Sequence, residues 1–229
     1  AMGGGNSVSN GTVAIGYKAG YAVTNPGWEG GVFIGYNAGA GWTNNVGTVI
    51  GYAAAPQGNP EGTTAVGYHA LNAIDGSSPG EGNTAIGHAS LLNTTTGGQN
   101  TAVGRNAMAL ATGAGDCTAV GHDAMAAHTT GASNTAVGFE ALKSNNTGHS
   151  NVAVGYRALQ RQNAAANLNT SVGFKSGEYL TTGDYNMFFG VEAGAWTSDG
   201  LTTGSHNLHI GYATKPSASD VDKEMVITI

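Results

Sequence analysis

A five-residue unit that closes with a glycine recurs along almost the whole chain, as in Asn100–Gly104 and Asn134–Gly138. Its twelve copies align on the closing glycines, which are Gly16, Gly35, Gly51, Gly67, Gly87, Gly104, Gly121, Gly138, Gly155, Gly173, Gly190 and Gly211. Their mean spacing is about 17.7 residues. A period of this kind predicts a solenoid, because one short repeat cannot bury its apolar residues alone but a stack of repeats can.

Each copy has the pattern of a short β-strand. The residue before the glycine is Val or Ile in eleven of the twelve copies, and β-branched side chains favour strands. Two residues earlier, on the same strand face, stands Thr in seven copies. After the strand, an Ala-Leu or Ala-Met step predicts a helical or irregular turn, and a Thr-Thr-Gly sequence predicts a tight reversal. We expect the chain's own Ala-Leu segment to cover the Val/Ile face of the strand.

The opposite face of the strand carries alanine in seven copies. A 17-residue turn has little left with which to cover this face, so the sequence predicts that another copy of the chain covers it. Small side chains suit the close approach of subunits around a symmetry axis. The predicted trimer contacts are Ala85, Ala102, Ala119, Ala136 and Ala153.

The composition excludes several classes of protein. Only 10% of the residues are charged, the net charge is −6, and 8 residues are Lys or Arg, which argues against binding to nucleic acid or to an anionic membrane surface. No apolar run approaches the length of about 18 residues that predicts a membrane span, so membrane insertion is not expected. The single cysteine, Cys117, excludes an intrachain disulfide, and a small buried thiol is the favoured interpretation.

The sequence therefore predicts an all-β chain, a β-roll or β-helix solenoid of about twelve turns with a period of about 17 residues that assembles as an intertwined or side-by-side homotrimer. Residues 1–10 read as a linker or cloning scar, 11–214 as the repeat solenoid, and 215–229 as a terminating segment with a final strand over Glu224–Ile229. Terminal units of a solenoid are expected to differ from central ones, because they close its open edges.

The unit Gly11–Gly16 and its central copies resemble the β-roll heads of trimeric autotransporter adhesins, which repeat a similar strand closed by glycine. The longer period and the recurrent Ala-Leu…Thr-Thr-Gly insert look more like repeats found in bacteriophage tail fibres. The segment Asp222–Ile227 is similar to the short strand that precedes a self-cleaving C-terminal chaperone in such fibres. The resemblance spans residues 11–214 for the repeat and implies a trimer.

The histidines are the first candidates for chemistry. His88 and His122 stand at the position after the glycine, where ten copies carry an aromatic or imidazole ring, so packing in a ring ladder explains them. His206 and His209 are three residues apart on a strand and point to opposite faces. His209 occupies the alanine position, so at a threefold axis three copies would converge and bind a metal or an anion. No other cofactor is expected.

Receptor binding needs irregular surface and anchoring aromatic side chains. These gather in the two regions that flank the regular repeats, and the candidates are Trp28, Trp42, Tyr179, Tyr185 and Trp196. The alternative for these aromatics is that they cap the solenoid. The ring ladder is a second candidate for sugar stacking, although stacking of its members on one another is favoured.

No catalytic motif stands out, and we expect no enzyme activity. Asp116 with Asp123, or Asp184 with Glu192, are conceivable carboxylate pairs for glycoside cleavage, but nothing in the sequence couples them. Ice binding needs an outward array of threonines on strands, and the threonine pairs stand at turns. The first hypothesis is therefore a phage tail fibre on the virion, attaching it to a bacterial surface glycan or outer-membrane receptor. The alternatives are the head of a bacterial surface adhesin and a polysaccharide-degrading tailspike.

Overall fold

The computed structural model describes residues 11–23, 30–43, 47–58, 61–73, 80–163, 165–194 and 202–228. These residues form short β-strands and turns, and no helix occurs among them. The strands are β1 (Val13–Ile15), β2 (Val32–Ile34), β3 (Gly47–Ile50), β4 (Thr63–Val66), β5 (Thr84–Ile86), β6 (Thr101–Val103), β7 (Thr118–Val120), β8 (Thr135–Val137), β9 (Val152–Val154), β10 (Thr170–Val172), β11 (Met187–Phe189), β12 (Leu208–Ile210) and β13 (Met225–Ile227).

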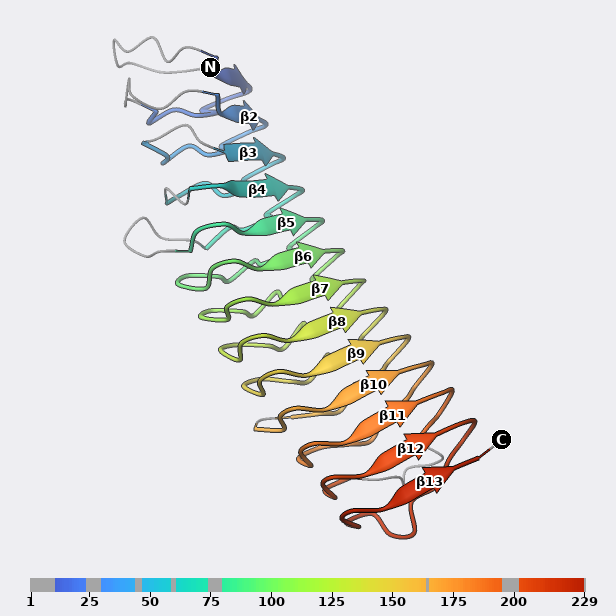
Figure 1. Ribbon diagram of the computed structural model, residues 1–229. Helices are drawn as coiled ribbons and strands as arrows, with labels where there is room; N and C mark the ends of the chain where they lie inside the picture. Colours follow the sequence, from blue (N-terminus) through green and yellow to red (C-terminus); the bar gives the residue numbers. More distant parts are fainter. Residues whose placement is uncertain are drawn as a thin grey trace. The chain divides into compact units, whose positions relative to one another are not determined.

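The strands belong to two compact units, Ala1–Gly115 with β1–β6 and Asp116–Ile229 with β7–β13. Within each unit, consecutive strands pair in parallel and in register, one strand per repeat (Figure 1). Every predicted strand is confirmed, because β1–β12 each end directly before one of the twelve aligned glycines. The all-β solenoid prediction is therefore confirmed for both units.

The terminating segment also contains its predicted strand. Although residues 215–229 depart from the repeat in sequence, β13 pairs in parallel and in register with β12, with His209 opposite Val226. The segment thus adds one more layer to the sheet of the second unit.

The closing glycine allows each turn to lie directly on the next. Gly138 has a φ of +136°, and a Cβ on it would overlap the carbonyl oxygen of Gly155 in the following turn. Gly155 has the same relation to Gly173. A residue with a side chain fits neither the backbone conformation nor the space, which explains why glycine closes every copy.

The segment that follows each closing glycine and leads back toward the next strand, here called the return segment, is irregular and not helical. It bends at two residues with left-handed backbone conformation. Glu140 and Leu142, for example, have φ values of +54° and +48°, with the buried Ala141 between them. Left-handed leucine is uncommon, and such a conformation costs of order 1–3 kcal/mol. Full burial of the leucine side chain contributes about 1.5–3 kcal/mol, which offsets that cost.

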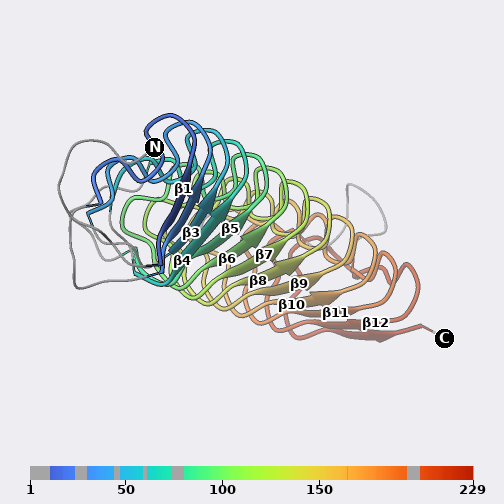
Figure 2. The same cartoon turned by 90° about the horizontal axis from the view of Figure 1, so that it is seen from above.

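Figure 2 shows each unit along its stack, with the strands on one wall and the return segments opposite. The alanine of each central strand and the Leu or Met of the return segment are both fully buried and fill the interior between these walls. The side-chain volumes on the two walls are complementary. Where Phe33 or Phe188 replaces the strand alanine, the return segments present glycine: a Cβ on Gly20 or Gly39 would meet Phe33, and one on Gly177 or Gly194 would meet Phe188.

A row of buried asparagines, the asparagine ladder, opens the strands. In the second unit it comprises Asn134, Asn151, Asn169, Asn186 and Asn207. Asn151 is typical: its Oδ1 accepts a hydrogen bond from the Asn169 backbone N at 3.0 Å, and its Nδ2 donates to the Ala166 carbonyl at 2.9 Å. Each amide thereby satisfies backbone groups of two turns, as buried polar groups require.

Cys117 stands where this ladder has asparagine, and its thiol donates to the Gly131 carbonyl oxygen at 3.6 Å, a longer contact that His128 supplements. The His128 Nε2 lies 2.8 Å from the Gly131 carbonyl oxygen, the group to which an asparagine at 117 would donate. The Cys117 Sγ lies 3.8 Å from the same nitrogen. The small buried thiol predicted from the sequence is confirmed, and burial raises the pKa of the Cys117 thiol, which lowers its reactivity.

Candidate functional site

The outward face of each sheet is an uncharged strip of threonine, valine and larger apolar side chains. In β7 and β8 the strand alanine is fully buried, whereas Val120 and Val137 are 36% and 37% exposed. The outward residues of β11 to β13 are larger still, and Met187, Phe189 and Met225 are all exposed. We call the first and third residues of the strands β7–β13 the outer strip.

The prediction that the alanine face lies open was wrong. The alternation of the strand was read correctly, but its two faces were assigned the wrong way round, because the return segment packs its Leu or Met against the alanines. The predicted trimer contacts are fully buried within their own chain and offer no surface to a partner: Ala85, Ala102, Ala119, Ala136 and Ala153. The threonines of β7, β8 and β10 face outward on their strands, as the same-face pattern with Val predicted, and the threonine pair Thr129–Thr130 lies between strands, as predicted.

Rings at the position after the glycine stack on one another in both units. In the first unit, Tyr17, Tyr36, Tyr52, Tyr68 and His88 form a ladder with centroids 5.1–5.2 Å apart. In the second, His122, Phe139, Tyr156 and Phe174 do the same at 5.1–5.4 Å. Stacking covers the faces of the inner rings and leaves their edges to solvent. These inner rings therefore stabilise the stack and are poor platforms for a sugar.

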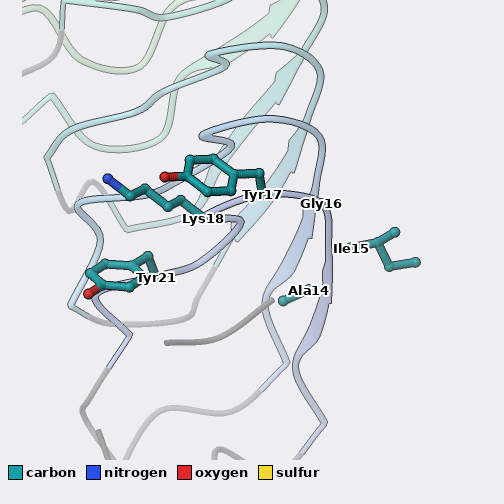
Figure 3. A pocket seen from close by; sticks show the side chains of 6 residues that line it. All are labelled: Ala14, Ile15, Gly16, Tyr17, Lys18 and Tyr21. Atoms are coloured by element: carbon teal, nitrogen blue, oxygen red, sulfur yellow. The ribbon is translucent and has the colours of Figure 1, made fainter. Parts of the chain in front are cut away.

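A pocket of about 820 Å³ lies at the first turn, where the ladder of the first unit begins (Figure 3). It is lined by Ala14, Ile15, Gly16, Tyr17, Lys18 and Tyr21. In Figure 3, Tyr17, Lys18 and Tyr21 extend on one side of the chain, and Ile15 points to the other. Sequence reasoning missed Lys18 and Tyr21. The available signal was a cation directly after a ladder ring, a combination that recurs at Arg157 and Lys175.

The predicted receptor residues are scattered. Trp42 is fully buried, and its Nε1 donates to the Ala55 carbonyl at 2.9 Å, so its prediction as a receptor contact was wrong. Tyr179 is partly buried beneath the Arg161 guanidinium, 4.5 Å from the ring centroid. Tyr185 is half-exposed and stacks on His206 at 4.8 Å. Trp28 and Trp196 lie outside the described residues.

His209 lies inside the solenoid and not on its surface. It is fully buried, stacks on Phe188 at 5.7 Å, and both ring nitrogens lack a hydrogen-bond partner. Burial lowers the pKa of His209, which keeps the ring neutral. Its predicted convergence at a threefold axis was therefore wrong. In the part of the chain that the structure describes, no group of three or more His, Cys, Asp or Glu side chains is placed to hold a metal ion.

Of the four weighed carboxylates, two have clear structural partners. Asp123 pairs with Lys143 at 3.4 Å, and Asp184 accepts a hydrogen bond from the Asn167 backbone N at 2.6 Å. Neither arrangement has the form of a catalytic pair, in which one carboxyl is kept protonated and the other ionised.

The most extensive charge cluster surrounds Glu140, a nearly buried carboxylate. It accepts hydrogen bonds from Lys143 at 2.6 Å, from Arg157 at 2.8 Å and from Gln160 at 2.6 Å. Burial alone would raise the pKa of Glu140, but the hydrogen bonds from Lys143 and Arg157 outweigh it and hold this pKa below its usual 4.5. Together with the Asp123–Lys143 pair, the cluster ties three successive turns together.

Replacing Glu140 by Gln should lower the free energy of unfolding by about 1 kcal/mol at pH 7, since a charged hydrogen bond is worth about 1.5–3 kcal/mol and the partly exposed cations are screened. A carboxylate with a lowered folded pKa stabilises above its unfolded pKa of about 4.5 and loses that contribution as the pH falls through the folded pKa. Urea unfolding of both proteins at several pH values should therefore show curves that converge in acid. The exposed Glu61→Gln serves as control, and a difference that persists in acid would contradict the role of the charge.

No protein-family model, curated protein or solved structure matches this chain. None of the described segments is a helix long and apolar enough to cross a membrane.

Proposed function

We propose that this chain is a segment of a homotrimeric bacteriophage tail fibre that attaches the virion to the surface of a bacterial host. The observation that carries the proposal is the outer strip, an apolar face that a single chain leaves uncovered. The repeat also resembles those of phage fibres, and its stacked turns suit a rigid element of a fibre.

The outer strip contains no charged residue in any of its seven strands. If each of its side chains exposes roughly 50 Å², the strip offers on the order of 700 Å², close to the approximately 800 Å² that each partner buries in a standard interface. An exposed patch of this size exceeds what a soluble monomer usually shows. Two copies of an uncharged face can also pack together without burying an unpaired charge, so further copies of this chain are suitable partners for the outer strip.

The subunit number of three comes from the resemblance, and the outer strip supports the association. Three copies would multiply weak receptor contacts by effective concentration, which suits attachment to a repeated surface glycan or an abundant outer-membrane protein. The head of a bacterial surface adhesin shares this physical logic. Labelling of purified phage particles by an antibody against the chain would support the fibre, and labelling of bacterial cells alone would support the adhesin. Shortening of a bacterial polysaccharide by the purified protein would favour the tailspike.

The outer strip is tested by placing charge on it. The wild-type chain should have a mass of three times 22.8 kDa, about 68 kDa, by light scattering. Val120→Lys combined with Val137→Lys should give 22.8 kDa, because two buried lysines per chain would lack partners. Leu168→Lys is the matched control: Leu168 is 46% exposed in the same unit but lies off the strip, so its variant should keep the wild-type mass.

A wild-type protein that is a monodisperse monomer would contradict the assembly. If that monomer also slowed the growth of ice crystals, the outward threonines and valines would instead form an ice-binding face.

A further inference from the structure

The pocket of the first turn combines an exposed ring with a cation. Tyr36, Tyr52 and Tyr68 each lie between two stacked rings, whereas Tyr17, at the start of the ladder, has one stacked ring among the described residues, Tyr36, and lines the pocket. Tyr17 is accordingly 60% exposed, more than Tyr36, Tyr52 and Tyr68. Among the tyrosines of this ladder, Tyr17 is thus the ring best placed to stack on a ligand.

Lys18 places its ammonium group near two rings of this turn. Its Nζ lies 5.5 Å from the centroid of Tyr17 and 5.7 Å from that of Tyr21. Cation–π contacts at this distance are near the limit of their range and hold the ammonium weakly. The described carboxylates of the first unit are Glu61 and Glu81, which precede β4 and β5 and so belong to later turns. An anion that reaches the pocket would therefore meet a cation that no described carboxylate neutralises.

We propose that this pocket binds a carboxylate-bearing sugar, such as an acidic residue of a bacterial surface polysaccharide. The apolar face of the pyranose ring stacks on Tyr17, the carboxylate pairs with the Lys18 ammonium, and the Tyr21 hydroxyl hydrogen-bonds to the sugar hydroxyls. The pocket volume of about 820 Å³ admits one to a few sugar residues and lies in the usual range for ligand sites. A charge-assisted hydrogen bond to the carboxylate supplies the selectivity for an acidic over a neutral sugar.

This inference deepens the proposed function, since it names the class of receptor to which the fibre attaches. Its biological role rests on that function, but the binding itself does not. Each chain of a trimer would carry one such pocket, so an acidic polysaccharide that presents the same sugar repeatedly would engage several pockets at once.

Titration calorimetry with glucuronic acid and with glucose tests the proposal, because the two sugars differ in the carboxylate. We expect the wild-type protein to bind glucuronic acid at least tenfold more tightly than glucose. Lys18→Met should abolish this preference by weakening glucuronic acid about tenfold while leaving glucose unchanged, and Tyr17→Ala should weaken both sugars. Lys175→Met is the matched control: Lys175 occupies the same repeat position over Phe174 at 5.7 Å in the second unit, and its removal should change neither affinity.

Equal binding of glucuronic acid by the wild type and Lys18→Met, or no binding by the wild type, would overturn the proposal. Circular dichroism of each variant checks that a loss of binding is not caused by unfolding. The trimer mass and the labelling of phage particles do not depend on this pocket, so if they are as expected while sugar binding fails, only the pocket proposal is lost.

Discussion

Gly155→Ala is expected to lower the free energy of unfolding by about 4 kcal/mol. Two costs add at this position. Gly155 has a φ of +138°, a conformation that costs a residue with a side chain about 1–3 kcal/mol. The new Cβ would also overlap the carbonyl oxygen of Gly173, and such overpacking typically costs about 1–3 kcal/mol. The contact is with backbone of the next turn, so no side chain can rotate away to relieve it.

Denaturant unfolding of the variant beside Gly115→Ala would measure this cost. Gly115 has no positive φ, and a Cβ on it would stand 3.7 Å from the Gly98 carbonyl oxygen, an ordinary contact. The control variant should therefore unfold close to the wild-type denaturant concentration. If Gly155→Ala did the same, the turns would have room between them and the explanation for the closing glycines would be wrong.

The strands were predictable from sequence because their signal is local. Threonine and valine on one face, alanine on the other and a closing glycine define three residues of strand wherever they occur, and all twelve predicted strands were found. The inward face was not predictable in the same way. Alternation shows that Ala136 and Val137 point to opposite sides, but the return segment decides which side is inside. There Leu142 adopts a positive φ that propensity does not favour for leucine, and this bend carries its side chain to Ala136's side of the strand.

For the candidate site, too, the sequence did not show which side chains are buried and which come together. Composition marked Trp42 as a rare, large side chain, which fits a receptor anchor and a core filler equally, and its burial makes it a core filler. Lys18 was overlooked because its significance depends on the exposed ring of Tyr17 and on Tyr21 three residues on, which come together only when the turn is folded. A repeat pattern reveals the residues that recur in every copy, whereas the residues that line this pocket are particular to the first turn.

His128→Ala is the second substitution with a large expected effect, about 3 kcal/mol of unfolding free energy. The imidazole is fully buried, with Nε2 2.8 Å from the Gly131 carbonyl oxygen and Nδ1 3.0 Å from that of Asn145. A neutral ring donates to one of the two, and leaving a buried acceptor without its donor costs about 1–3 kcal/mol. The cavity left by the ring adds to this cost.

Cys117→Asn should rescue much of that loss, because it restores the residue that the asparagine ladder has elsewhere. In the next turn, Asn134 Nδ2 donates to the Gly148 carbonyl at 2.7 Å, and an asparagine at 117 would reach the Gly131 carbonyl in the same way. With His128 present the two donors compete for one acceptor, so Cys117→Asn alone should gain nothing. Urea unfolding of the wild type, both single variants and the double variant forms a complete cycle, in which we expect a favourable coupling of about 1–2 kcal/mol. Strictly additive effects would show that His128 does not replace the missing ladder amide and that its burial has another cause.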